Sequence, residues 1–186
     1  HLNWKGDNVS IAAGNKRAAI ALDQLIDLGG GVTAKCLTTN AQISGGGSVS
    51  PGSDENAKSV GLLVTYGSFS YFIGGDTPGD DAPLDGLGPN IDTEEILRTP
   101  VGNLDVLKVH HHGSTYSSNT NWCTTTAPEA AVIQCGDGNT YGHPTQNAVN
   151  RLANVCTKIY RTQVGTASTT HAKLVTTSAH TIVTTA

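Results

Sequence analysis

The histidine triplet at positions 110–112 is the feature of this sequence best suited to do chemistry. It follows the apolar run 104–109, which reads as a strand, and it is closed by Gly113. Successive side chains of a strand point to opposite faces, so His111 faces away from its two neighbours unless Gly113 re-aims the chain. Imidazole is a favoured zinc ligand and can also move protons, so we expect at least one of the three to face a pocket. Histidines that pack at the surface are the alternative.

Two further residues could share a site with the triplet. Asp76 ends the predicted hairpin 59–76, and His143 directly precedes a predicted helix. Each also has an ordinary interpretation, as a turn carboxylate and as a loop histidine packed on Pro144. The sequence has no GK[ST] phosphate loop, no GxGxxG fingerprint and no GxSxG nucleophile elbow. Histidine and aspartate at strand ends, without an evident nucleophile, point toward hydrolysis by a metal-activated water.

Alternating strand and helix patterns surround these residues and predict a chain of mixed α and β structure. Single strands are expected at 9–14, 32–39, 104–109, 130–136 and 158–162, and hairpins at 59–76, around a Gly67–Ser68 turn, and at 173–185. Helices are expected at 15–30, at 92–99 with Asp92 as N-cap and Pro100 as the stop, near 119–126, and at 145–156 with Thr145 as N-cap. No internal repeat or linker is apparent, so we expect one domain over 1–186.

Charge and hydropathy narrow the range of partners. The formal charge is −4, and the 11 lysines and arginines are scattered along the chain. This pattern does not support a nucleic-acid partner, although bound metal ions could supply positive charge locally. No apolar run approaches the roughly 20 residues that span a bilayer, so no transmembrane segment is expected. The expected partner is a small-molecule or polymer substrate.

Four cysteines show neither a CxxC pair nor zinc-finger spacing: Cys36, Cys123, Cys135 and Cys156. Their even number, with low charge and many Thr and Ser residues, favours one or two disulfides in a secreted or extracytoplasmic protein. Buried free thiols would give the same count.

The order of motifs resembles the second half of a metallo-β-lactamase-fold domain. The segments that carry the resemblance are SVGLLVTYGSFSYFIGGD, DVLKVHHHGSTYSSN, AAVIQCGDGNTYGHPTQNAVNRL and KIYRTQVGT, which fall within about 53–166. They are similar to the branch found in the competence protein ComEC and related exported hydrolases. The resemblance implies an αββα sandwich, in which two sheets are faced by helices, with one or two metal ions at the sheet edge.

The resemblance also implies roles for particular residues. Asp76 matches the family aspartate that binds or bridges the metals, and His111 matches the histidine ligand of the HHGS motif. His112, beside that ligand, and His143, of the GHP motif, would position the substrate or protonate the leaving group, which makes Asp76, His112 and His143 the catalytic candidates. Polar residues that match the substrate side of the site are Ser114, Asn56 and Ser59, together with His143. Zn²⁺ is the expected metal, with Mn²⁺ as the alternative.

One departure from the family pattern is large. The principal metal motif, HxHxDH, should precede all of these segments and is absent from the sequence. The chain begins HLNW, so His1 could be the last histidine of that motif and a third metal ligand, with the N-terminal part of the fold missing. The resemblance then implies a metal-dependent hydrolase, most simply of phosphodiesters. Hydrolysis of an ester, lactone or amide, and an exported domain that has lost its metal site, are the alternatives.

Overall fold

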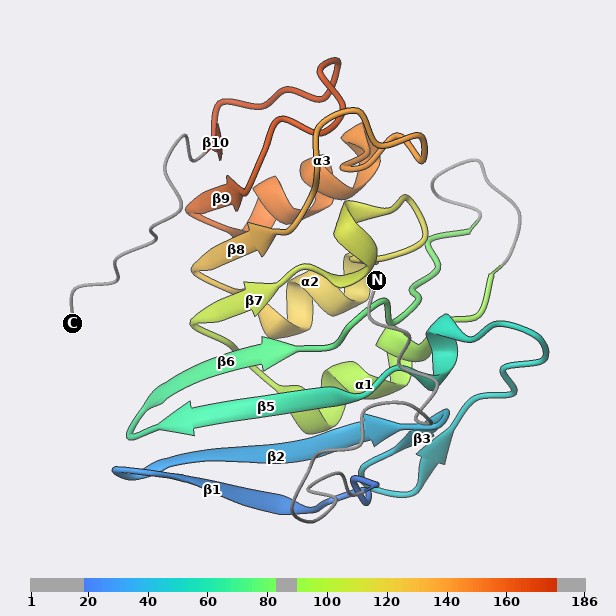
Figure 1. Ribbon diagram of the computed structural model, residues 1–186, viewed down its shortest axis with the longest axis vertical. Helices are drawn as coiled ribbons and strands as arrows, with labels where there is room; N and C mark the ends of the chain where they lie inside the picture. Colours follow the sequence, from blue (N-terminus) through green and yellow to red (C-terminus); the bar gives the residue numbers. More distant parts are fainter. Residues whose placement is uncertain (1–18, 83–89, 177–186) are drawn as a thin grey trace, which may run out of the picture.

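A computed structural model describes residues 19–82 and 90–176 of the chain. It contains a ten-stranded mixed sheet with the strand order β10-β9-β8-β7-β6-β5-β2-β3-β4, and β1 pairs with β2 beside this path (Figure 1). The strands are β1 (Leu25–Gly29), β2 (Val32–Thr39), β3 (Gln42–Ile43), β4 (Gly47–Ser48), β5 (Gly61–Tyr66), β6 (Phe69–Ile73), β7 (Val106–Lys108), β8 (Ala130–Ile133), β9 (Lys158–Arg161) and β10 (Leu174–Thr176). The α-helices are α1 (Thr93–Val101), α2 (Thr120–Thr126) and α3 (Gln146–Val155). The predicted mixed α/β class is confirmed.

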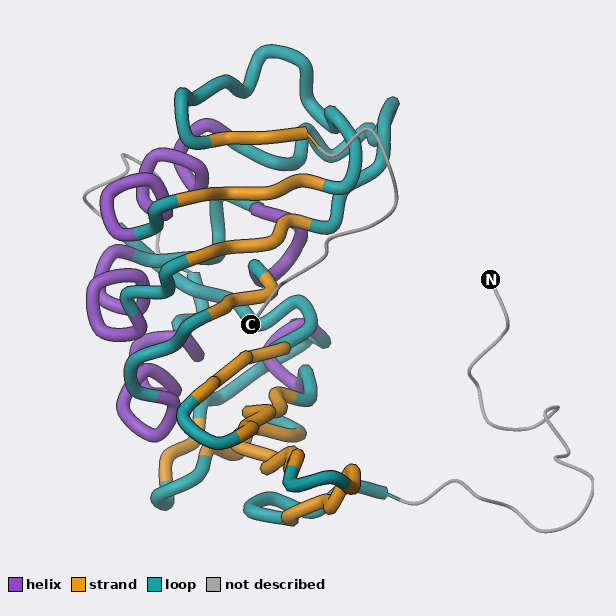
Figure 2. Tube along the Cα trace, turned by 90° about the vertical axis from the view of Figure 1, so that its left-hand side faces the viewer, coloured by secondary structure: helices purple, strands orange, loops and turns teal. Residues whose placement is uncertain are grey.

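The three α-helices lie along one side of the sheet, as Figure 2 shows. Strand and helix side chains between them form the core, in which Phe72, Leu107, Ile133, Trp122 and Leu152 are all fully buried. Within residues 19–82 and 90–176 no α-helix covers the other side of the sheet (Figure 2). The second sheet of the αββα sandwich is therefore not seen in this part of the chain, and the sandwich stays a prediction.

Strand direction brings one set of strand ends together. The β5–β6 hairpin is antiparallel and turns at Gly67, whose positive φ of 57° suits a glycine. From β6 to β10 every neighbouring pair is parallel. The register aligns Ile73 of β6 with Lys108 of β7, and Lys108 with Val132 of β8. The carboxyl ends of these three strands therefore meet at one edge of the sheet, where loops commonly carry functional side chains.

Polar caps define where the helices begin. Asp92 accepts a hydrogen bond from the backbone N–H of Glu95 (2.9 Å), Asn119 from Trp122 (2.6 Å) and Thr145 from Ala148 (3.4 Å). The predicted N-caps Asp92 and Thr145 are confirmed.

The expected end of the first of these helices is wrong, because α1 continues through Pro100 to Val101. Pro100 lies in the last turn, so its missing N–H removes a single intrahelical hydrogen bond, and Gly102 N–H still bonds to the carbonyl of Arg98 (3.0 Å). A proline this close to a helix end is tolerated.

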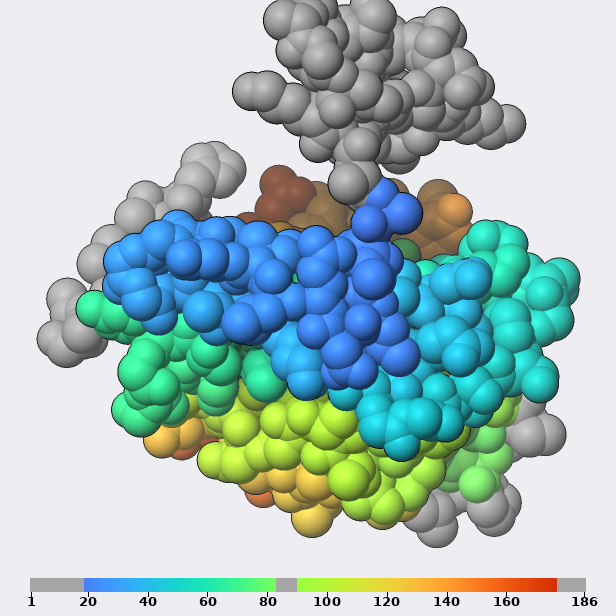
Figure 3. Space-filling model, turned by 90° about the horizontal axis from the view of Figure 1, so that it is seen from below, coloured from blue at the N-terminus to red at the C-terminus, as the bar shows by residue number. Residues whose placement is uncertain are grey.

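The predicted helix at 15–30 is wrong where the structure describes it. Residues Leu25–Gly29 form β1, which pairs antiparallel with β2. Leu25 and Leu28 are 63% and 57% exposed, so no apolar helix face is buried there. Glycines at 29–31, all with positive φ, stop a helix and turn the chain back onto β2. Figure 3 shows these blue segments at the surface of this end of the molecule.

Several sequence predictions fall partly or wholly outside the described residues. They are the strand at 9–14, the first residues of the helix at 15–30, and the second strand of the hairpin at 173–185. The first strand of that hairpin is present as β10, which pairs parallel with β9. None of the helices among residues 19–82 and 90–176 has the length and apolar character that crossing a membrane requires.

The disulfide prediction is wrong for this structure. All four cysteines are free thiols, and Cys36, Cys123 and Cys156 are buried. Cys156 is surrounded by apolar core, and this burial raises the pKa of its thiol to about 12. Cys36, Cys123 and Cys156 act as small buried residues, as the alternative interpretation expected, and the four free thiols give no support to export.

Candidate functional site

The histidine triplet forms a tight turn immediately after β7. His111 and His112 adopt left-handed backbone conformations, with φ of 46° and 56°, and Gly113 follows with φ of 75°. The expected departure at Gly113 therefore begins two residues earlier, at His111. Left-handed conformations cost roughly 1–2 kcal/mol for residues with a Cβ and persist where the surroundings enforce them, often at functional sites. Here His111 N–H donates to the carbonyl of Gly75 (3.2 Å) and ties the turn to the end of β6.

His110 points away from that edge and into the core. Its side chain is fully buried, and its Nδ1 donates to Oε1 of Glu94 (2.6 Å). The same carboxylate accepts the backbone N–H groups of Ser118 (2.8 Å) and Asn119 (2.7 Å). We call His110, Glu94 and these two backbone groups the buried cluster. It links the turn after β7 to α1 and to the start of α2.

Asp76 follows β6, where the sequence places it, and is partly exposed. Its backbone N–H donates to Oγ of Ser59 (3.2 Å), and its Oδ1 lies 3.6 Å from Nε2 of His112. Nδ1 of His112 donates to the carbonyl of Gln134 (2.7 Å). This hydrogen bond places the ring proton on Nδ1 and leaves Nε2 as an acceptor facing the carboxylate when the ring is neutral.

His111 and His143 meet although they lie far apart in the sequence. Their ring centroids are 5.5 Å apart in an edge-to-face arrangement, and Nδ1 of each is buried without a hydrogen-bond partner. Burial lowers the pKa of both imidazoles below the usual histidine value, and the Asp76 carboxylate opposes this only in part. Both rings are therefore held toward the neutral form, which can accept a proton or bind a metal.

The structure thus brings Asp76, His111, His112 and His143 to one edge of the sheet. We call these four residues the edge cluster. Ser59, from the sequence candidates, contacts it through Asp76. Ser114 is 3% exposed, and its Oγ accepts the N–H of Tyr116 (3.2 Å).

The structure describes one of the two remaining sequence candidates. Asn56 begins the short 3₁₀ helix η1 (Asn56–Lys58), and its N–H donates to Oδ1 of Asp54 (2.9 Å). His1 lies outside the described residues. The roles predicted for Ser114, Asn56 and Ser59 stay predictions.

Sequence reasoning missed two charged residues next to the edge cluster. Lys108 is 6% exposed, and its Nζ donates to the carbonyl of Gly75 (3.2 Å). Burial lowers the pKa of this lysine, and the Asp76 carboxylate opposes the shift. The negative charge of Asp54 lies close enough to His111 to oppose, in small part, the lowering of its pKa by burial. Lys108 stands two residues before the triplet, inside an otherwise apolar strand. A charged residue at such a position was the signal that could have identified it.

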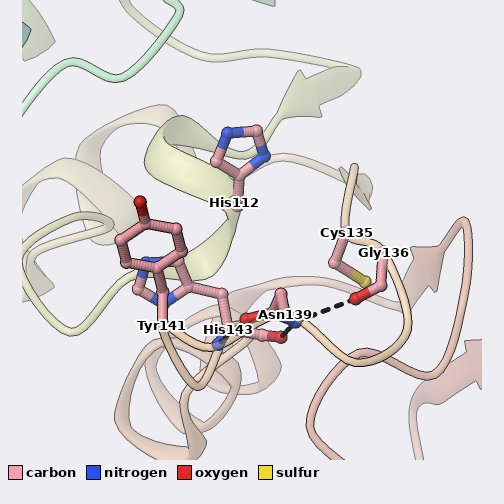
Figure 4. Close-up of a pocket in the computed structure, with 6 residues that line it drawn as sticks. All are labelled: His112, Cys135, Gly136, Asn139, Tyr141 and His143. Carbon is pink, nitrogen blue, oxygen red and sulfur yellow. Dashed lines mark hydrogen bonds between the residues drawn. The ribbon is translucent and has the colours of Figure 1, made fainter.

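A cavity of about 220 Å³ opens beside the edge cluster (Figure 4). Its lining residues are His112, Cys135, Gly136, Asn139, Tyr141 and His143. Asn139 shapes the loop, because its Nδ2 donates to the carbonyls of Gly136 (2.9 Å) and His143 (2.8 Å) while its Oδ1 accepts His143 N–H (3.0 Å). Tyr141 stacks on His143 with ring centroids 6.0 Å apart and an interplanar angle of 16°.

The edge cluster fits a metal ion only in part. The unpartnered Nδ1 atoms of His111 and His143 and the carboxylate of Asp76 are suitable donors. However, in the part of the chain that the structure describes, no three His, Cys, Asp or Glu side chains are grouped closely enough to hold a metal ion. A catalytic zinc takes about three protein ligands and an open position, so these residues alone do not complete a metal centre.

Known proteins similar to this chain are found among competence proteins. The chain is 32% identical over 113 residues to competence protein ComA of Neisseria gonorrhoeae, and 29% identical over 109 residues to ComE operon protein 3 of Bacillus subtilis (strain 168). It is 29% identical over 98 residues to recombination protein 2 of Haemophilus influenzae. The chain is similar, in part, to the ComA and ComEC group of competence proteins.

This similarity is distant and covers only a small part of the relatives. The matched stretches are 60%, 58% and 53% of this chain, but 15%, 13% and 11% of the respective relatives. No family model matches the chain. The expected resemblance to ComEC-type proteins is confirmed at this level, and hydrolysis and metal binding belong to the proposal below.

Proposed function

We propose that this chain is the hydrolase region of a ComEC-type protein and cleaves phosphodiesters at the edge cluster. The partial similarity to competence proteins supports the family. The observation that carries the reaction is the convergence of Asp76, His111, His112 and His143 from three loops at one sheet edge, with two buried ring nitrogens left without partners. A buried polar atom without a partner is costly, so these two ring nitrogens call for an explanation, which a bound ligand would supply.

The residues of the edge cluster have different proposed roles. His112 is oriented by Gln134 and faces Asp76, so it is placed to carry a proton to a leaving group or away from a nucleophile. His143 and His111 present neutral rings, whose lone pairs can bind a ligand or accept a proton. The hydroxyl oxygen of Ser59 accepts the backbone N–H of Asp76 and so fixes the position from which the Asp76 side chain extends.

The proposal includes a metal, Zn²⁺ or alternatively Mn²⁺, in one or two copies. Asp76 and His111 would be this chain's described ligands, and the remaining ligands would come from outside the described residues, with His1 as one candidate. The αββα sandwich belongs to the same proposal, because the helix-free side of the sheet offers a face for a second layer.

A phosphodiester is preferred over an ester, lactone or amide as the substrate. Lys108 places a buried ammonium beside Asp76, where it can offset the negative charge that a phosphate brings. The chain as a whole carries a formal charge of −4, so long-range attraction of a polyanion contributes little.

The test is hydrolysis of bis(4-nitrophenyl) phosphate by the full chain, titrated with Zn²⁺ and with Mn²⁺, alongside measurement of bound metal. We expect metal-dependent turnover that falls at least about 100-fold in Asp76→Asn, a change that leaves the backbone bond to Ser59 intact. Asp27→Asn, which alters an exposed carboxylate in β1, is the matched control and should retain full activity. Turnover that survives Asp76→Asn contradicts the proposal.

A non-catalytic domain is the second candidate, favoured by the lack of a three-residue metal group in the described ranges. It predicts less than about half an equivalent of bound metal and no turnover with either ion. If 4-nitrophenyl acetate is cleaved while the phosphodiester is not, an esterase-type substrate replaces the preferred one.

A further inference from the structure

The backbone around Asp76 rests on the buried cluster at two glycines. A Cβ at Gly74 would collide with the ring of His110, at 2.7 Å from Cδ2. A Cβ at Gly79 would collide with the carboxyl group of Glu94, at 2.7 Å from Cδ. Only glycine leaves room for so close an approach of backbone to side chain. We call residues 74–79 the aspartate segment, which the buried pair thus contacts on both sides of Asp76.

Hydrogen bonds keep the aspartate segment against the pair. The carbonyl of Gly74 accepts the hydroxyl and the N–H (3.2 Å) of Thr77, and the carbonyl of Pro78 accepts the N–H of Glu94 (3.1 Å). Thr77 and Pro78 are buried, whereas Asp76 is partly exposed. The backbone therefore has little freedom to move, while the carboxylate it carries still reaches the edge of the sheet.

The buried pair is itself held from the other side. Neither side chain of the pair has any solvent exposure, and Oγ of Ser117 donates to the carbonyl of His110 (3.0 Å). The imidazole lies between Phe72 and Trp122, with ring centroids 5.7 Å and 5.0 Å away. Close packing of this kind transmits displacement instead of absorbing it. The ring of His110 is therefore a firm support for Gly74.

His110 also begins the turn that brings the triplet to the edge cluster. His111 N–H bonds to the carbonyl of Gly75 (3.2 Å), and the carboxylate of Asp76 lies 3.6 Å from Nε2 of His112. Asp76 thus approaches from one segment and the two imidazoles from another, and His110 belongs to the second while it supports the first. A displacement of about 1 Å in a reacting group can cost about 100-fold in rate.

We propose that Glu94 and His110 are positioning residues, which fix the place of the Asp76 carboxylate relative to the imidazoles of His111 and His112. Their effect on the reaction rests on the proposed function of the edge cluster, whereas the placement of the aspartate segment is measurable without it. His110 is fully buried, so it acts through Asp76 and not on a substrate.

Substitutions separate the contacts of the pair. Asparagine puts an N–H donor near the position of Nδ1, so His110→Asn keeps the bond to Glu94 and removes the ring atoms that touch Gly74. Glutamine reaches the position of Nε2, so His110→Gln keeps an atom against Gly74 and loses that bond. Glu94→Asp draws the carboxyl group back from Gly79. Leu152→Ala, in the core beside α3, is the control for general loss of stability.

The measurement is amide hydrogen exchange of the full chain by NMR, under conditions where every variant is folded. The reporters are the amides of Asp76, Thr77 and His111. Their rates are divided by that of Ile159, a fully buried residue of β9 whose N–H bonds to the carbonyl of Lys173 (3.0 Å). A local opening raises this ratio, and a general loss of stability does not.

We expect the exchange ratio to rise at least about 10-fold in His110→Asn and at least about fivefold in Glu94→Asp, because the aspartate segment opens locally. His110→Gln should raise it less than about threefold, and Leu152→Ala should not raise it.

Hydrolysis of bis(4-nitrophenyl) phosphate is the second readout. The kcat of His110→Asn should fall at least about 10-fold while KM stays within about threefold, because a displaced carboxylate weakens the transition state more than it weakens substrate binding. Leu152→Ala should keep kcat within about twofold.

Three results would overturn the inference: an unchanged exchange ratio in His110→Asn, an equal rise in His110→Gln, or an equal rise in Leu152→Ala. Failure of the proposed function looks different, because turnover would be absent from the parent chain while the exchange ratio still rose in His110→Asn. Parental turnover that His110→Asn retains in full, despite its faster exchange, would leave the proposed function standing and overturn the positioning role.

Discussion

The buried cluster around His110 and the edge cluster around His111 begin at neighbouring residues and have opposite environments. His110 is fully buried, and its Nδ1 shares the carboxylate of Glu94 with two backbone N–H groups. His111 has a left-handed backbone, and its buried Nδ1 has no partner. The first arrangement pairs Nδ1 of His110 and two backbone N–H groups with one carboxylate, although Nε2 of His110 is itself buried without a partner. The second combines an unpaired ring nitrogen with a strained backbone and has no such carboxylate. We therefore expect the stability of the fold to depend mainly on the buried cluster and the proposed chemistry on the edge cluster.

The largest expected effect comes from removing the carboxylate of the buried cluster. Glu94→Ala leaves one imidazole N–H and two backbone N–H groups buried without an acceptor, so we expect a loss of about 3–5 kcal/mol in the free energy of unfolding. Urea denaturation measures it. Glu95→Ala, the neighbour that pairs with Arg98 at the surface, is the control and should cost less than about 1 kcal/mol. Equal losses in the two variants would contradict the comparison.

The next effect concerns the glycine that packs on His110. A Cβ at Gly74 would lie 2.7 Å from Cδ2 of His110 and 2.8 Å from Cε1 of Phe72, both in the core. Gly74→Ala should therefore lower the free energy of unfolding by about 1–3 kcal/mol. Gly136→Ala, where the nearest atom is Oε1 of Gln163 at 3.5 Å, should change it by less than about 0.5 kcal/mol. An unchanged urea midpoint in Gly74→Ala would show that the turn can move away from β6.

A change in the edge cluster should behave differently. His111→Gly relieves a left-handed backbone and removes a ring whose buried Nδ1 has no partner. Relief of the strain stabilises the folded chain, and the greater entropy that glycine gives the unfolded chain offsets part of this gain. We therefore expect the free energy of unfolding to stay the same or to rise by up to about 1 kcal/mol. Phosphodiester turnover should fall at least about 100-fold in the same variant. Destabilisation by more than about 1 kcal/mol would mean that His111 supports the fold as His110 does.

The smallest effect is a pH dependence near the buried cluster. Burial raises the pKa of Asp92 to about 7, and the charges of Glu94 and Glu95 add to the shift. Between about pH 4 and pH 7 the folded chain then holds a proton that the unfolded chain has released, so this carboxyl makes stability fall as pH rises through that window.

Asp92→Asn keeps an N-cap side chain and removes the titration. The variant should gain stability relative to the parent chain between pH 4 and pH 8, by about 1 kcal/mol or less once solvent screening is allowed for. Urea midpoints at four pH values measure the difference. Parallel pH profiles for the two proteins would refute the assignment.

Local patterns predicted much of the fold. The strand at 32–39 and the hairpin around Gly67 match the structure, and so do the N-caps Asp92 and Thr145. Each of these depends on side-chain alternation, turn residues or capping groups that lie close together in the sequence. The helix predicted at 15–30 failed because pairing with β2 competed with an apolar repeat whose leucines have nothing to pack against.

The candidate site was predictable as a set of residues and not as an arrangement. Motif order marked Asp76, the triplet and His143, and the structure places all of them except His110 at one sheet edge. The sequence did not show that His110 turns inward to Glu94, because that carboxylate looked like an ordinary residue in the first turn of a helix. It also gave no sign of the exposed ring of Tyr141 beside the cavity.

The amino-acid sequence alone determined the strand at 32–39, the hairpin around Gly67, the N-caps Asp92 and Thr145, and which residue types stand at the strand ends. The tertiary structure decided how the three histidines divide between core and edge, because left-handed backbone at His111 and His112 changes the direction of consecutive side chains. Parallel pairing of β6, β7 and β8 then set their carboxyl ends side by side. Contacts across such distances depend on packing and register, which no local pattern encodes.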